Sequence, residues 1–275
     1  MRFKLAYIFV FVTVFFTVAQ TSKRNFRQRE LGVFLGGSYY IGDLNTFKHF
    51  IYSKPAVGAF FRYTTNYRYA FRFGFNYGNI AASDSKSSNP DQLQRNANFQ
   101  SAIYEFNAIS EFNFVEYRIG HDKHYFTMYI FAGIAGFHFD PKGNIGQGWQ
   151  SLQPLRTEGQ AKPYLLEQIS IPFGIGFKYN LGKFMGIGFE WGPRKTFTDY
   201  LDDVSGLYPD PKTTSSSGLL YAYRNKAGLL NDQIATMRGN PRTKDWYFFY
   251  GLSINFKLGD PHRPCYGVGM NTSRF

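Results

Sequence analysis

Cysteine, acidic residues and long apolar runs are all scarce in this chain. A single cysteine, Cys265, occurs among 275 residues, so internal disulfides cannot hold the fold together. Only 19 acidic residues oppose 31 lysines and arginines, a net charge of +12. The basic residues are scattered along the chain, which argues against nucleic acid as a partner and fits anionic lipid head groups or an acidic partner. After the N-terminus no apolar run is long enough for a membrane-spanning helix, which excludes a helical membrane bundle.

The one apolar run lies at the very start. Arg2 and Lys4 precede "LAYIFVFVTVFF", and small Ala19 comes just before Gln20. This order of charged, apolar and small residues is typical of a secretory signal peptide, predicted over 1–19. A permanent anchor helix is the alternative, but the run is shorter than the roughly 20 residues of a bilayer span. We therefore expect export, with residues 20–29 as a short segment in the periplasm.

Aromatic residues are plentiful, at a fifth of the chain, and they recur at every second position. The stretch "YAFRFGFNYG", residues 69–78, places Tyr69, Phe71, Phe73, Phe75 and Tyr77 on one face of a strand. Arg72 and Asn76 then lie on the other face. One face is fully apolar and the other is polar, which predicts a strand between lipid and a polar interior.

Eight such amphipathic segments run along the chain, at residues 30–40, 54–65, 68–79, 99–114, 125–139, 167–180, 184–194 and 245–258. They are long for soluble strands but suit the about 9 to 11 residues of a tilted membrane strand. Long connections, at 41–53, 80–98, 140–166 and 195–244, alternate with short ones. The sequence thus predicts an all-β fold, an eight-stranded antiparallel transmembrane β-barrel of the outer membrane over 30–258. Both termini would be periplasmic, with a tail at 259–275.

The alternation also assigns the two faces of the barrel, except in 125–139, which does not alternate cleanly. The predicted lipid-facing side chains include Tyr69, Phe71, Phe73, Phe75, Trp191 and Trp246. The predicted inward charges are Arg62, Arg72, Lys178 and Arg194 with Glu105, Glu111 and Glu190. Eight strands enclose a lumen that side chains can fill, and buried charges must pair, so we expect a salt-bridge network that plugs it.

Catalysis has little support in the pattern. Glu105 and Glu111 could be an acid/base pair, but six residues along one strand separate them by roughly 20 Å. The aspartates of "TDYLDDVSGLYPDP", residues 198–211, do not have the spacing of a known calcium loop. We expect instead a short helix over "YLDDVSGLY" capped by Thr198 or Asp199, then a mobile surface loop from Pro211. No catalytic, cofactor-binding or metal-ligating set is predicted.

Four blocks carry a resemblance: "LGVFLGGSYYIGDLN", "KPAVGAFFRY", "FAGIAGFHFDPKG" and "WGPRKTFTDYLDDVSGLYPDP". They resemble the PorG family, outer-membrane barrels of the type IX secretion system in Bacteroidetes. The resemblance implies a non-enzymatic component that anchors or organises a periplasmic ring. That ring is built by a PorK or GldK type lipoprotein and its PorN or GldN type partner. The resemblance further implies a system that exports proteins across the outer membrane and supports motility in gliding relatives.

Cys265 lies in the tail, which the predicted topology places in the periplasm. A lone cysteine in an oxidising compartment is either a free thiol or half of an intermolecular disulfide. We hypothesise a disulfide to the ring lipoprotein. Two other functions stay open: a structural or adhesin-type small barrel, and a lipid-modifying enzyme, for which the sequence shows no Ser, His and acidic group converging at one rim.

Overall fold

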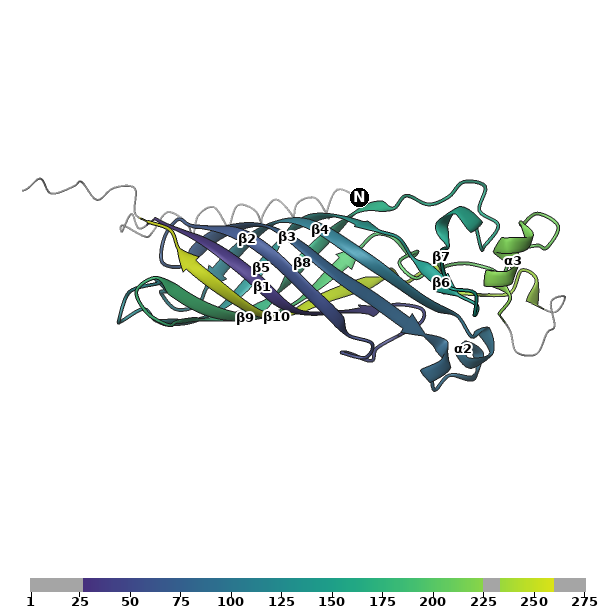
Figure 1. Ribbon diagram of the computed structural model, residues 1–275, viewed down its shortest axis with the longest axis horizontal. Helices are drawn as coiled ribbons and strands as arrows, with labels where there is room; N and C mark the ends of the chain where they lie inside the picture. The colour runs from purple at the N-terminus through teal and green to yellow at the C-terminus, as the bar shows by residue number, and fades with distance from the viewer. Residues whose placement is uncertain (1–26, 225–232, 260–275) are drawn as a thin grey trace, which may run out of the picture.

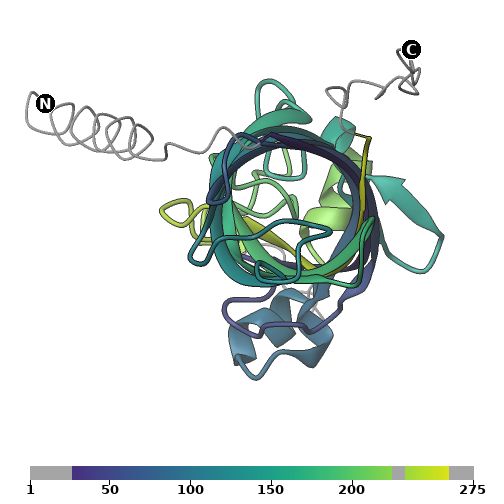
Figure 2. The same cartoon turned by 90° about the vertical axis from the view of Figure 1, so that its left-hand side faces the viewer.

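Eight long strands form the body of the molecule, a computed structural model that describes residues 27–224 and 233–259. The strands are β1 (Gln28–Ile41), β2 (Lys54–Thr64), β3 (Tyr69–Ser83), β4 (Asn98–Asn113), β5 (Phe126–Phe139), β8 (Glu167–Asn180), β9 (Met185–Thr196) and β10 (Trp246–Lys257). Each is antiparallel to its neighbours along the chain, and β1 pairs with β10, so the sheet closes (Figure 1, Figure 2). The predicted fold class, a closed eight-stranded antiparallel β-barrel, is confirmed.

The two ends of the barrel differ in the length of their connections. Residues 65–68, 114–125 and 181–184 join strands at one end, the short-turn end, where β1 also begins and β10 ends. The connections 42–53, 84–97, 140–166 and 197–245 lie at the other, the long-loop end (Figure 1). They contain η1 (Asp84–Lys86), α2 (Pro90–Arg95), the hairpin β6 (Lys142–Asn144) with β7 (Trp149–Ser151), η2 (Gln153–Leu155) and α3 (Ser216–Ala222). Among the described residues no helix is long and apolar enough to cross a membrane.

Glycine lets strands approach where the seam closes. Gly36 of β1 lies opposite Gly251 of β10. A Cβ on Gly36 would lie 2.0 Å from the Tyr250 carbonyl oxygen, and one on Gly251 would lie 2.4 Å from the Leu35 carbonyl oxygen. Both distances are far below van der Waals contact, so only glycine permits this packing.

Strand β5, whose facing the sequence left open, has apolar residues on both sides. Tyr129, Phe131 and Phe137 are buried in the lumen, whereas Met128 and Ile134 are exposed outside. The sequence of β5 does not alternate between apolar and polar residues, because aromatic rings line this part of the lumen. Alternation reports facing only where the two sides differ in polarity.

The predicted helix over "YLDDVSGLY" is wrong. Residues 200–206 contain bends at 201–203 and 206 and no helix. Asp203 has a φ of 66°, and the Val204 N–H donates to the Asp202 side chain at 2.9 Å. Aspartate side chains that bond nearby backbone in this way compete with a helix. A helix forms later, α3, where we expected a mobile loop, with the Ser215 hydroxyl accepting from the Gly218 N–H.

Side chains fill the barrel along its length. Towards the long-loop end an apolar cluster combines strand residues such as Phe99 and Phe249 with Leu201 and Val204 from the longest connection. At the short-turn end the connection 114–125 is buried at Tyr117 and Ile119. A cavity within the lumen has a volume of only about 10 Å³. It is lined by Phe34, Phe60, Arg72, Gly74, Asn76, Asn107 and Glu190. That is room for about one water molecule.

Candidate functional site

All seven charges predicted to face inward lie buried in the lumen, and Glu30 of β1 joins them. The set comprises Arg62, Arg72, Lys178 and Arg194 with Glu30, Glu105, Glu111 and Glu190. Four cations thus meet four carboxylates. Sequence reasoning missed Glu30 because it was taken as the first residue of its segment, although it alternates in phase with the inward side of β1.

Glu111 of β4 is the centre of this network. Its carboxylate lies 2.9 Å from Arg62 Nε, 3.2 Å from Arg72 Nε and 2.6 Å from Lys178 Nζ. Arg62 also reaches Glu30 at 2.8 Å. Strands β2, β3, β4 and β8 are therefore held together by contacts to the Glu111 side chain.

The remaining carboxylates have partners of their own. Arg72 pairs with Glu190 at 2.5 Å, and Arg194 Nε lies 3.1 Å from Glu105. Glu105 also accepts hydrogen bonds from the Asn76 amide at 2.8 Å and the Tyr247 hydroxyl at 2.8 Å. Glu105 and Glu111 thus belong to separate partner sets, each enclosed by donors, which suits the filling of a lumen rather than acid/base chemistry on a shared substrate.

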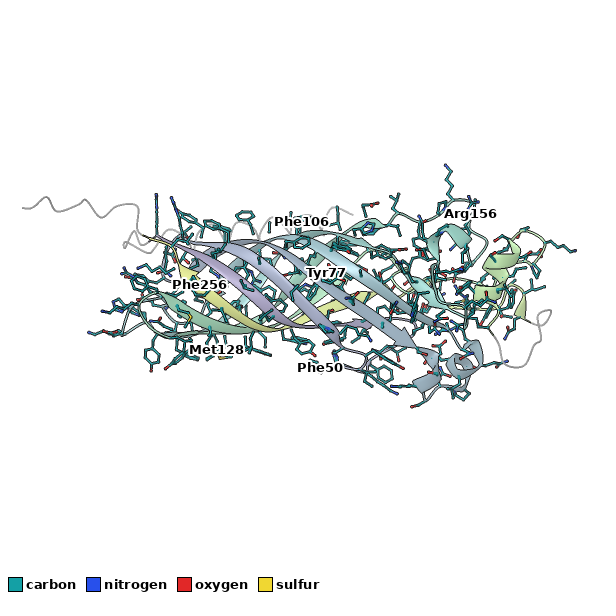
Figure 3. All side chains as sticks on the ribbon, in the orientation of Figure 1. Phe50, Tyr77, Phe106, Met128, Arg156 and Phe256 are labelled. Atoms are coloured by element: carbon teal, nitrogen blue, oxygen red, sulfur yellow. The ribbon has the colours of Figure 1, made fainter. Side chains whose placement is uncertain are left out.

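The outer wall carries the predicted apolar face. Phe71 and Phe73 are about half exposed, whereas Tyr69 and Phe75 are partly covered by aromatic neighbours on β4. Trp191 donates to the Tyr39 hydroxyl at 2.9 Å, and Trp246 packs edge-on against Phe173. Figure 3 labels three further exposed side chains of this belt, Phe106, Met128 and Phe256. Others are Leu31, Val33, Leu35, Ile134, Ile169 and Leu252. An apolar belt around a closed barrel is the surface that lipid requires.

The connections of the long-loop end fold together into a second buried site, here called the cap. The cap meets the barrel at the pair Asp202 and Asp245, which lie 2.5 Å and 2.9 Å from the Tyr40 hydroxyl of β1. Asp245 also accepts from the Leu201 N–H at 2.9 Å. Leu201 and Val204 are inserted into the apolar cluster of the barrel, so this polar group fixes the cap in the mouth.

One hydroxyl between two carboxyl groups constrains their protonation. The Tyr40 hydroxyl has one proton to donate, so it can accept from the second carboxyl only if that group is protonated. Burial, together with the nearby charge of Asp43, holds the pKa of Asp202 well above its usual range. Burial and the charge of Asp202 do the same to the pKa of Asp245.

A second acidic group of the cap surrounds Asp203. Its carboxylate accepts from the hydroxyls of Thr157 and Tyr164, and Arg238 lies 3.7 Å away. Burial raises the pKa of Asp203 to about 6. Burial also raises the pKa of Asp199, which accepts from the Ser205 hydroxyl, to about 6.

Two arginines supply the cationic side of the cap. Arg95 of α2 pairs with Asp84 through Nε at 2.7 Å and Nη2 at 2.8 Å, and it donates to the Arg238 carbonyl oxygen at 2.7 Å. Arg238 pairs with Glu158 at 3.0 Å. Five aspartates are buried in the cap against these two arginines: Asp84, Asp199, Asp202, Asp203 and Asp245. The cap is therefore an acid-rich assembly.

The cap has an open pocket but no metal-binding geometry in the part described. The pocket, about 460 Å³, is lined by polar groups such as Asp43, Arg95 and Lys244 together with Trp246. Within residues 27–224 and 233–259, no three His, Cys, Asp or Glu side chains are grouped to hold a metal ion. Of the four aspartates considered for calcium, Asp210 is exposed, whereas Asp199, Asp202 and Asp203 are buried.

Sequence reasoning missed most of the cap. A signal did exist in "SYYIGD", where the strand alternation stops at two consecutive tyrosines, Tyr39 and Tyr40, both of which are buried. Another lay in "YLDDVS", where Leu201 and Val204 flank the aspartates. Cys265 and the predicted signal peptide lie outside the described residues.

Comparison with known proteins gives one family and several barrels. The family described as "Domain of unknown function (DUF6089)" matches residues 5–269. No curated protein matches the chain.

Solved structures with a similar shape are small barrels of low sequence identity. The attachment invasion locus protein Ail of Yersinia pestis is 11% identical, with 84% of this chain and 99% of that chain covered and a TM-score of 0.42. The N-terminal β-barrel domain of Pseudomonas aeruginosa OprF is 10% identical, with 85% and 100% covered and a TM-score of 0.37. Neisserial surface protein A is 6% identical, with 84% and 97% covered and a TM-score of 0.38. Such values carry no functional assignment.

Proposed function

We propose that this chain, which belongs to the DUF6089 family, is a non-enzymatic outer-membrane barrel that holds a folded cap at the cell surface. The single observation that carries this proposal is the insertion of the cap into a filled barrel. Leu201 lies in the apolar cluster of the lumen, and Tyr40 bonds Asp202 and Asp245 above it. The barrel then serves as an anchor and the cap as the exposed, structured surface.

The membrane part of the proposal rests on the outer wall. A closed barrel leaves no unpaired backbone in lipid, and exposed Phe73, Phe106 and Leu252 fit hydrocarbon rather than water. Transmembrane barrels of bacteria carry short periplasmic turns and long external loops. The short-turn end would then face the periplasm and the cap would face outward.

Transport and catalysis fit the interior poorly. The lumen cavity of about 10 Å³ leaves no path for a solute. The carboxylates of the lumen are enclosed by their cationic partners. The acidic groups of the cap lie beneath the surface, where they fix loops in place. A structural or adhesin-type role agrees with this arrangement.

Two measurements on the full chain test the proposal. Planar-bilayer recordings should show no steady conductance, and protease treatment of intact cells should cleave the exposed segment 211–216 but not the turn 181–184. A stable pore would contradict the anchor role. Cleavage at 181–184 with protection of 211–216 would reverse the orientation.

A second candidate function is the type IX secretion role, which the sequence blocks favour. Two of those blocks supply the central contact of the cap, Tyr40 from "GSYYIGDLN" and Asp202 from "TDYLDDVSGLY". On this proposal the periplasmic ring of PorK or GldK type lipoprotein, with the PorN or GldN type protein behind it, meets the short-turn end and the tail. Cys265 would form the disulfide to the lipoprotein.

Non-reducing gels of native envelopes test that role. A thiol-sensitive band of higher mass should be present with the natural chain and absent with Cys265→Ser. A pull-down that loses the ring lipoprotein when 259–275 is removed would assign the contact to the tail. Intact secretion and gliding after deletion of the gene would rule the role out.

A further inference from the structure

A groove on the side of the cap combines exposed apolar side chains with two lysines. It lies between the connection after β1 and the region of η1 and α2, which bulge from the same side of the barrel in both views (Figure 1, Figure 2). The groove has a volume of about 440 Å³. Phe47, Ile51 and Tyr52 line its apolar part, and Lys48 and Lys86 line its edge.

The backbone of the first wall is held in an unusual conformation. Phe50 and Tyr52 have positive φ angles of 62° and 57°, which bulky residues rarely adopt. The Phe50 ring lies 5.0 Å from the rings of Tyr39 and Tyr250, and the Tyr52 hydroxyl donates to the Ser83 carbonyl oxygen at 3.1 Å. These contacts hold Phe50 and Tyr52 in place, and in the same loop the Phe47 side chain is 75% exposed. Backbone strain maintained by surrounding contacts is concentrated at binding sites.

The loop that forms the first wall of the groove packs on the lipid-facing belt through Phe50, the neighbour of the groove residue Ile51. Phe50 packs on the outward face of β1 and β10, and Leu252, the next outward residue along β10, is 59% exposed. Figure 3 shows Phe50 at a similar level along the long axis as Tyr77, one of the outward tyrosines. Aromatic residues at this level mark the border between hydrocarbon and head groups. The wall of the groove that carries Phe50 therefore adjoins the level of the head groups of the surrounding leaflet.

The contacts of the two ammonium groups leave their positive charges unpaired with any carboxylate of the described residues. Lys48 Nζ lies 3.5 Å from the Ser88 hydroxyl and from the Lys86 carbonyl oxygen, which are long contacts for an ammonium donor. Lys86 Nζ lies 5.1 Å from the centre of the Tyr52 ring. In the described part of the chain, neither lysine forms an ion pair with a carboxylate. Two cations beside an apolar floor complement a phosphorylated amphiphile.

We propose that this groove binds the phosphorylated glycolipid of the outer leaflet, lipid A. Its phosphate lies between Lys48 and Lys86, and an acyl chain lies against Phe47 and Ile51. The inference rests on the proposed function, because it requires a barrel in the outer membrane with the cap outward. The cap would then be fixed to its membrane as well as to its own barrel.

Native mass spectrometry of the full chain, folded in detergent and titrated with bisphosphorylated lipid A, tests this. The double variant Lys48→Gln with Lys86→Gln should lose about tenfold in affinity per lysine. The control variant Lys162→Gln with Lys212→Gln, also exposed in the connections of this end, should bind as the natural chain does. Dephosphorylated lipid A should bind both double variants alike, and Phe47→Ser should weaken binding of either lipid.

Other results would overturn the binding site, the assignment of the lipid or the proposed function, and they can be told apart. Equal affinity of the two double variants for bisphosphorylated lipid A would overturn the site. Displacement of the lipid by equimolar inorganic phosphate would overturn the lipid assignment in favour of a free-phosphate site. A chain that forms no heat-modifiable folded band in detergent or bilayers would overturn the proposed function and this inference with it. A chain that folds but binds without regard to Lys48 and Lys86 leaves the proposed function standing.

Discussion

The lumen and the cap are both buried polar assemblies, but their charges are balanced in different ways. In the lumen four carboxylates meet four cations, and each carboxylate has a cationic neighbour. In the cap five buried aspartates meet two buried arginines. Burying an unpaired charge is costly, so the excess carboxyl groups of the cap are favoured in their protonated form. The barrel is therefore held by ion pairs, and the cap is held in part by protons.

The largest effect is expected from removing the centre of the lumen network. Glu111→Gln keeps the shape of the side chain but leaves Arg62, Arg72 and Lys178 without its charge. Breaking a buried ion pair costs about 3–5 kcal/mol of unfolding free energy. Urea unfolding, followed by the heat-modifiable gel band, measures it. Ser110→Ala, the outward neighbour on β4, is the control; equal midpoints for the two variants would contradict the network's role.

A smaller and local effect is expected where the cap enters the mouth. Leu201→Ala removes a fully buried side chain and should destabilise the seating of the cap by about 2–5 kcal/mol. Limited proteolysis should then cleave 197–223 faster while the urea midpoint of the barrel stays unchanged. Leu207→Ala, in the same connection but 46% exposed, is the control. If Leu201→Ala also lowers the urea midpoint of the barrel, the cap and the barrel unfold as one cooperative unit. That result would contradict the distinction drawn between the lumen and the cap.

The difference in proton content predicts a dependence on pH. Burial raises the pKa of Asp203 to about 6, above the about 3.9 of an unfolded aspartate. The Asp203 carboxyl group thus binds its proton more tightly in the folded cap than in the unfolded chain. The resulting stabilisation of the folded cap is present below about pH 4 and is lost as pH rises through about 6. It amounts to at most about 3 kcal/mol for a shift of about two units.

Asp203→Asn is the test of that linkage. The variant should flatten the pH dependence of cap proteolysis between pH 5 and 8, because the amide does not titrate. Asp210→Asn, exposed in the same connection, should leave the dependence as it is. A cap of Asp203→Asn that still loosens with the natural pH profile would assign the effect to the other acidic residues.

The smallest effect is expected for an exposed ion pair outside both assemblies. His138 Nδ1 lies 3.0 Å from Glu167 on the outer wall, where the two side chains are 42% and 76% exposed. Exposed ion pairs contribute little, so Glu167→Gln should change the free energy of unfolding, measured by urea, by less than about 0.5 kcal/mol. A loss as large as that of Glu111→Gln would show that burial is not what distinguishes the lumen.

The two assemblies were also unequally predictable from sequence. The period of two fixed the facing of Phe73 and Arg72, because lipid and lumen differ in polarity. It failed in β5, where Phe131 faces inward and Ile130 outward and both are apolar. The pairings inside the cap could not be predicted, since Tyr40, Asp202 and Asp245 come together only through contacts across 162 and 205 residues. No local pattern encodes such pairs, and the helix expected around Asp202 shows how local propensity misleads there.

Amide hydrogen exchange of the natural chain at pH 5 and pH 8, corrected for intrinsic rates, tests the central claim most directly. The account predicts that the amides of Leu201 and Val204, which donate to Asp245 and Asp202, exchange much faster at pH 8. The amides of β4 around Glu111 should keep the same protection at both values. Equal protection of the cap at both pH values, or a parallel loss in β4, would contradict a cap held by protons on a barrel held by ion pairs.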